Sequence, residues 1–185
     1  MRTFIAIEPP AELRQAFEDF CRSISVHFSG VRWSAGKNIH LTLRFLGEIE
    51  PDRLETLANA VTEAAAGGES FRLVPSLAGC FGSKRNPRVI WLGLNEEPLL
   101  KALARRLEDS LQRGGFGSAD KPFRGHLTLA RVKKPLRSLP DWEAVNRNLP
   151  AAGWPEWKVS EVHIINSTLT PQGPTYKILK TCALR

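Results

Sequence analysis

His40-Leu41-Thr42-Leu43 and His126-Leu127-Thr128-Leu129 repeat one four-residue sequence, and each copy lies in a stretch with the composition of a β-strand. Side chains alternate along a strand, so the leucines of each copy point to one face and its histidine and threonine to the other. An imidazole and a hydroxyl on one face, about 6.6 Å apart along the strand, make half of an acid–base site. A single strand histidine is more often a structural residue, but the repeat in the same phase favours a site.

The 185 residues carry a net charge of +7, and 42% of them are apolar, which suits one globular domain or two small lobes with a shared core. The positive charge favours a polyanion such as nucleic acid as partner, although charge alone is weak support. The apolar run before Glu8 is too short for a signal peptide, and no run approaches the ~20 residues of a membrane span. The three cysteines contain no C-x-x-C pair, which favours reduced thiols. We therefore expect a cytoplasmic protein.

Hydrophobic periodicity predicts four helices and about seven strands. The helices are expected to begin near residues 10, 51, 98 and 141. The strands are expected over residues 1–8, 39–46, 71–74, 89–94, 126–132, 159–169 and 176–184, with a further short one over 31–33. The glycine-containing, basic stretch 75–88 is expected to be a loop, either solvated or reaching for phosphates.

The turn Pro171-Gln172-Gly173-Pro174 predicts an antiparallel hairpin between the last two strands, which favours an α+β fold over a doubly wound sheet. The order of elements around each motif is similar: a helix, a turn, the histidine strand and a helical segment. This suggests a bilobal protein in which each lobe contributes one histidine strand to a central cleft. Outside the motifs the two halves show no clear repeat.

Two facing imidazoles suit a reaction in which one proton is removed and another is delivered, because histidine titrates near neutral pH. The two threonine hydroxyls are placed to donate hydrogen bonds to an anion between the strands, and a phosphate has oxygens enough for both. The sequence contains no cluster of carboxylates to hold a metal, so we expect neither a metal nor another cofactor.

With these motifs the chain resembles the 2H phosphoesterase superfamily and, within it, the RNA 2′,3′-cyclic phosphodiesterases, also called 2′-5′ RNA ligases. The similarity extends to the flanking stretches 2–7, 31–33, 40–47 and 121–131, which lie in the family's order along most of the chain. The resemblance implies a single domain over 1–185, with two intertwined lobes related by a pseudo-twofold axis through the active-site cleft. It also implies hydrolysis of a 2′,3′-cyclic phosphate at an RNA end, or in a nucleotide, to a 2′-phosphomonoester.

By the same resemblance His40 would be the proton donor to the departing 3′ oxygen and His126 the proton acceptor that activates water. Thr42 and Thr128 would hold the phosphate oxygens, with Arg131 also binding phosphate. The symmetry of the motifs does not itself say which histidine is the acid. Ligation of the cyclic end to a 5′-hydroxyl at the same site, and RNA binding without catalysis, remain alternatives. We expect a monomer with no membrane contact.

Several residues near the motifs have two interpretations. Arg131 points away from His126 in an ideal strand, so it needs a bend to reach the cleft. Arg44 shares the ideal face of His40, but it could equally be a surface charge. His163 is expected to be structural or solvent-facing. Four aromatic residues could stack on a terminal base, although core packing is expected for at least half of them: Phe4, Trp33, Phe123 and Tyr176.

Overall fold

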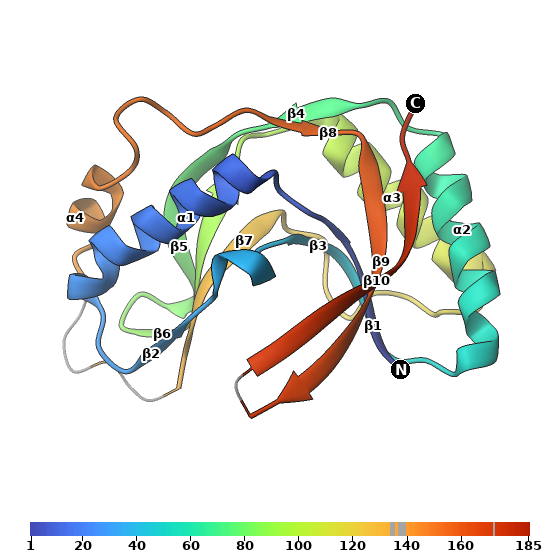
Figure 1. The fold of residues 1–185 in the computed structure, drawn as a ribbon, viewed down its shortest axis with the longest axis horizontal. Coiled ribbons are helices and arrows are strands. Elements are labelled where there is room, and N and C mark those ends of the chain that lie inside the picture. Colours follow the sequence, from blue (N-terminus) through green and yellow to red (C-terminus); the bar gives the residue numbers. More distant parts are fainter. Residues whose placement is uncertain (134–135, 137–139, 172) are drawn as a thin grey trace.

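The computed structural model describes residues 1–133, 136, 140–171 and 173–185, and it has the expected α+β fold (Figure 1). Gln172, in the expected hairpin turn, lies outside the described residues. The α-helices are α1 (Ala11–Ile24), α2 (Leu54–Ala66), α3 (Pro98–Arg113) and α4 (Trp142–Arg147). The strands are β1 (Arg2–Ile7), β2 (Val31–Trp33), β3 (Leu41–Glu48), β4 (Phe71–Leu73), β5 (Pro75–Ser83), β6 (Asn86–Leu94), β7 (His126–Val132), β8 (Trp157–Val159), β9 (Glu161–Thr170) and β10 (Gly173–Ala183).

The helices form where the apolar spacing predicts them. In α1 the buried side chains recur every three or four residues and face the core. Pro98 occupies the first turn of α3, where its missing N–H costs no hydrogen bond, and Glu97 accepts a hydrogen bond from the Leu99 N–H. Gly114 ends α3. No described helix is long and apolar enough to cross a membrane.

The strands form an antiparallel sheet in the order β10-β9-β1-β3-β7-β6-β5, with β2 also paired to β7. The two motif strands, β3 and β7, are joined in the middle of this order by one residue pair, Leu41 with Leu127. The sheet therefore divides into two halves, one with β1, β3, β9 and β10 and the other with β2, β5, β6 and β7. A separate pair, β4 with β8, completes the fold.

Helices occupy both ends of the molecule. Figure 1 shows α1 and α4 together at one end, and α2 beside α3 at the other. The second and fourth residues of each motif are buried with the apolar sides of all four helices in one core: Leu41, Leu43, Leu127 and Leu129. Because side chains alternate along a strand, the histidine and threonine of each motif point to the opposite face of the sheet.

The expectation of a loop over residues 75–88 is wrong, because this stretch forms β5, the turn and the first part of β6. Small residues conceal the strand pattern. Gly79 pairs with Trp91, whose ring leaves no room for a β-carbon at that position. Lys84 and Arg85 lie at the exposed tip of the hairpin.

Candidate active site

Both motif histidines are oriented by the backbone carbonyl two residues earlier. The His40 Nδ1 lies 2.8 Å from the Asn38 carbonyl oxygen, and the His126 Nδ1 lies 2.7 Å from that of Arg124. A carbonyl oxygen only accepts hydrogen bonds, so Nδ1 carries the proton in each ring. Each neutral histidine therefore has its lone pair on Nε2, free to accept a proton.

The single pair between β3 and β7 brings the two motifs together. Extending the Leu41–Leu127 register by one residue places His40 opposite Thr128 and Thr42 opposite His126. All four side chains are partly buried. The sequence prediction that these residues meet on one face is consistent with this register.

Each motif ends in a β-bulge. In β3 the pairing with β1 passes from Thr42 to Arg44 and leaves Leu43 as an extra residue. In β7 the pairing with β6 passes from Thr128 to Ala130 and leaves Leu129 as the extra residue. Such a bulge reverses the alternation of the side chains that follow it.

The bulge in β7 brings Arg131 onto the face of His126 and Thr128. It is the bend that Arg131 needs and that an ideal strand lacks. Consistent with this placement, the Arg131 charge acts on both motif histidines and lowers their pKa values. In the strand register, Arg131 lies opposite Arg32 of the neighbouring strand β2. The sequence suggests Arg131 as a site residue only through the family resemblance. The strand register explains how its side chain reaches the face of the two motif histidines.

The bulge in β3 has the opposite effect on Arg44, which an ideal strand would place beside His40. The Arg44 side chain turns towards α3, where its Nε lies 3.6 Å from Glu108 Oε2 and its Nη2 donates to the Gly117 carbonyl at 3.1 Å. It is neither at the site nor a solvated surface charge. Phe45 takes its place on the site face, half exposed, with the Arg2 guanidinium over its ring.

The electrostatics of the site keep both histidines neutral at pH 7. Burial lowers the pKa of His40 to about 4; the bond to Asn38 opposes this shift, while the charges of Arg14 and Arg131 add to it. Burial also lowers the pKa of His126, and Arg131 adds to that effect. Both imidazoles in the free protein are thus poised as proton acceptors.

Aromatic rings pack against each imidazole. The Phe4 and Tyr176 ring centroids lie 4.7 and 5.2 Å from that of His40, and Phe81 lies 4.8 Å from His126. Of the four aromatic residues singled out from the sequence, two thus lie beside His40, while Trp33 and Phe123 pack against the core. Phe81 was missed because its strand was expected to be a loop.

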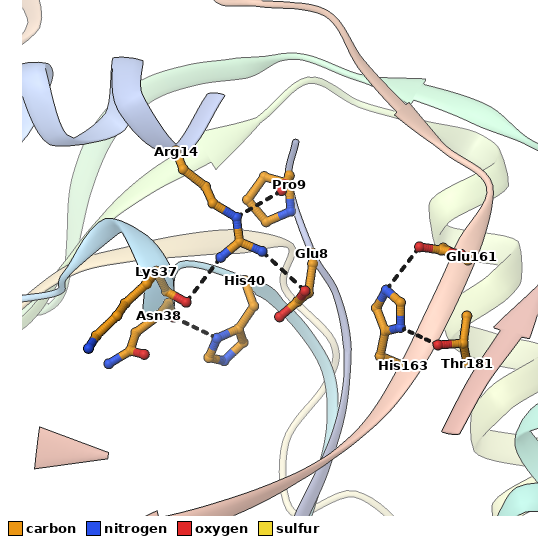
Figure 2. Close-up of polar contacts among 9 residues, drawn as sticks. All are labelled: Glu8, Pro9, Arg14, Lys37, Asn38, His40, Glu161, His163 and Thr181. Atoms are coloured by element: carbon orange, nitrogen blue, oxygen red, sulfur yellow. Dashed lines mark hydrogen bonds and ion pairs between the residues drawn. The ribbon is translucent and has the colours of Figure 1, made fainter. Parts of the chain in front are cut away.

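His163 lies outside this site, as expected for a structural residue. On β9 it is 5% exposed, its Nδ1 is 3.1 Å from Thr181 Oγ1, and its Nε2 is 3.4 Å from Glu161 (Figure 2). These three residues line a cavity of about 410 Å³ together with Glu8 and Arg14. Among the described residues, no group of three or more His, Cys, Asp or Glu side chains could hold a metal ion.

Two halves that each place one His-x-Thr strand at their junction define a 2H phosphoesterase. A family model described as LigT like Phosphoesterase matches residues 7–91 and again 92–176, so each match contains one motif. The chain belongs to this LigT-like phosphoesterase family, a family of enzymes.

Named relatives agree with this assignment. The chain is 35% identical over 183 residues to the RNA 2′,3′-cyclic phosphodiesterase of Thermotoga maritima, covering 98% of this chain and 95% of the relative. A crystal structure of a Thermus thermophilus protein matches with a TM-score of 0.82 at 30% identity, over 100% of this chain and 98% of that one. E. coli LigT complexed with 3′-AMP matches with a TM-score of 0.77 at 30% identity, over 99% of this chain and 97% of that one.

Proposed function

We propose that this chain hydrolyses the 2′,3′-cyclic phosphate at an RNA end, or in a nucleotide, to a 2′-phosphomonoester without a metal ion. The observation that carries the proposal is the in-phase meeting of the two motifs at Leu41 and Leu127, which sets a histidine opposite a threonine on each side. Relatives that match the chain over nearly its full length are named RNA 2′,3′-cyclic phosphodiesterases. One core joins both lobes, which supports a single domain over 1–185.

The two histidines divide the proton transfers. His126 Nε2 accepts a proton from water, and the water oxygen forms a bond to phosphorus as the bond from phosphorus to the 3′ oxygen breaks. His40 Nε2 delivers a proton to the departing 3′ oxygen. The products are a 3′-hydroxyl and a 2′-phosphomonoester. Afterwards His126 releases its proton to solvent and His40 takes one up, which restores the starting protonation states.

The remaining site residues stabilise the phosphoryl group. Thr42 and Thr128 donate hydrogen bonds to its non-bridging oxygens, where negative charge develops in the transition state. Arg131, on the same face after the β7 bulge, adds a positive charge. The backbones that carry these donors are held in paired strands, so little backbone reorganisation is needed during the reaction.

A proton donor must be protonated, whereas His40 is neutral in the free protein at pH 7. The cyclic phosphate carries a negative charge, and an anion next to Nε2 favours the imidazolium form. Substrate binding therefore raises the pKa of His40 and supplies the acid only when there is a leaving group to protonate.

The experiment is an assay of 2′,3′-cyclic AMP and of an RNA oligonucleotide with a cyclic end, each in excess EDTA. We expect turnover, with the 2′-monoester as the product identified by ³¹P NMR. Absence of turnover would contradict the activity. Loss of turnover on adding EDTA would contradict the metal-free mechanism, and a 3′-monoester would contradict the choice of leaving oxygen.

A further inference from the structure

The carbonyl that fixes the His40 ring belongs to a one-turn helix, η2 (Gly36–Asn38), directly before β3. The Asn38 carbonyl accepts the Nδ1–H of His40 at 2.8 Å. Whatever holds this turn in place therefore decides which ring nitrogen is protonated and where Nε2 points.

Arg14 of α1 joins this turn to the segment between β1 and α1, as Figure 2 shows. Its Nη1 donates to the Lys37 carbonyl at 3.0 Å, and its Nε donates to the Pro9 carbonyl at 3.1 Å. Its Nη2 pairs with Glu8 Oε2 at 3.1 Å. The side chains of Arg14 and Glu8 are 23% and 26% exposed, so the pair is only partly screened by water.

Two further contacts hold the turn. Glu18, also on α1, accepts a hydrogen bond from the Gly36 N–H at 2.7 Å. The Asn38 side chain donates to the Pro174 carbonyl of β10 at 3.1 Å, so the turn is fixed from two elements. Among the described residues no comparable hydrogen bond anchors residues 121–125, the loop that carries the Arg124 carbonyl for His126.

We propose that Arg14 is a positioning residue for His40: it holds the carbonyl of Lys37, and with it that of Asn38, so that His40 keeps its proton on Nδ1 and presents Nε2 to the phosphate. The expected effect of Arg14 on catalysis rests on the proposed function. Its expected effect on the orientation and tautomer of the His40 ring does not. Arg14 contacts no substrate in this scheme and acts through the backbone of η2.

The charge of Arg14 provides a second readout. The charged and titratable groups around His40 are Arg14 of α1 with its partner Glu8, Arg131 and His126 of β7, and Tyr176 of β10. Arg14 lowers the pKa of His40, so its removal raises that pKa. Lysine at this position would keep the charge without the guanidinium geometry.

The test compares Arg14→Met with Arg22→Met, a matched control on the same helix whose arginine pairs with exposed Asp19. For Arg14→Met we expect kcat to fall about tenfold with KM changed less than twofold, because a misplaced group loses effective molarity. We also expect ¹⁵N NMR of the His40 ring to show part of the neutral form protonated on Nε2. Arg14→Lys should lower kcat while leaving the pKa of His40 near its original value.

The outcomes separate this inference from the proposed function. An unchanged His40 tautomer and kcat in folded Arg14→Met would overturn the positioning role. A changed tautomer with unchanged kcat would overturn the positioning role in catalysis and would leave the proposed function standing, because the donor in that scheme is the imidazolium form of His40. If Arg14→Met does not fold, Glu8→Gln, which removes one charged partner of Arg14, must show the same tautomer change to a smaller extent, and its absence would overturn the inference.

Discussion

The motif strands β3 and β7 carry the same four residues in the same phase, yet they diverge directly after them. Each strand has a bulge at the last leucine of its motif. Beyond the bulge, β3 turns Arg44 towards α3 and presents Phe45, whereas β7 buries Ala130 and presents Arg131. The duplicated motif supplies a symmetric pair of imidazoles and hydroxyls, and the next two residues place a cation on one side and an aromatic ring on the other.

The two histidines also differ in their support. The turn before His40 is held by α1 and β10, and burial brings the pKa of this histidine to about 4. His126 is oriented by the equivalent carbonyl and packs against Phe81. Equal motifs thus lie in unequal surroundings, which is a way to give two identical side chains different roles.

The largest effect is expected from removing either imidazole. His40→Ala and His126→Ala should each lower kcat/KM by about 10³-fold, within the range for general acid–base catalysis, while folding normally. His27→Ala, outside the site, serves as the control. Steady-state kinetics on 2′,3′-cyclic AMP measure the effect, and near-normal turnover in either variant would contradict a two-histidine mechanism.

A substrate with sulfur in place of the 3′ oxygen assigns the roles that the symmetry of the motifs leaves open. A thiolate leaves without protonation, so this substrate should restore much of the activity of His40→Ala but not that of His126→Ala. The reverse pattern would exchange the acid and the base between the strands.

The threonine hydroxyls should come next in magnitude. Thr42→Val and Thr128→Val should each lower kcat by about 10²-fold, or about 2.7 kcal/mol, the cost of losing one oxyanion donor. Thr→Ser variants keep the hydroxyl and are the controls. Unequal losses at the two positions would show that the phosphate sits closer to one strand, and no loss at either would contradict their role as donors.

The residues beyond the bulges should separate catalysis from stability. Arg131→Ala should lower kcat/KM about tenfold, near 1.4 kcal/mol, with the melting temperature nearly unchanged. Arg44→Ala should leave kcat/KM unchanged but cost about 2 kcal/mol of unfolding free energy, because Glu108 loses its charged partner and the Gly117 carbonyl loses a donor. Chemical denaturation and kinetics on both variants check this, and a catalytic loss in Arg44→Ala would contradict the reversed alternation.

The sequence was sufficient for the parts of this site that depend on local pattern. Alternation placed His40 and Thr42 on one face, and helical spacing located α1 to α4. The sequence was insufficient where the conformation of a strand depends on the strand that it pairs with. The bulges at Leu43 and Leu129 exist because of how β1 and β6 pair with the motif strands, and no residue type marks them.

The missed strand β5 has a related cause. Its glycine at position 79 makes room for Trp91 on the neighbouring strand, so the reason for the residue lies in a contact that is distant in sequence. The local composition therefore predicts a turn, because the side chain that completes the strand pattern is on the partner strand.

The pH dependence of the unmodified protein compares the two histidines directly. In the free protein both pKa values lie below 6.5, so the profile of kcat/KM should have its maximum below pH 6.5 and fall about tenfold per unit beyond each limb. The profile of kcat should lie at higher pH, because bound phosphate raises both pKa values. A kcat/KM maximum above pH 7 would contradict the burial of the pair.

Arg131→Gln sharpens this comparison. The Arg131 charge lowers the pKa of His40 and of His126, so its removal should move both limbs of the kcat/KM profile to higher pH. Arg44→Gln should move neither limb, because that guanidinium pairs with Glu108 on the far side of the sheet. Arg44 lies one residue beyond the bulge of β3, and Arg131 lies two residues beyond the equivalent bulge of β7. A shift in the Arg131 variant alone would therefore tie the pH dependence to the face of the sheet on which each arginine lies.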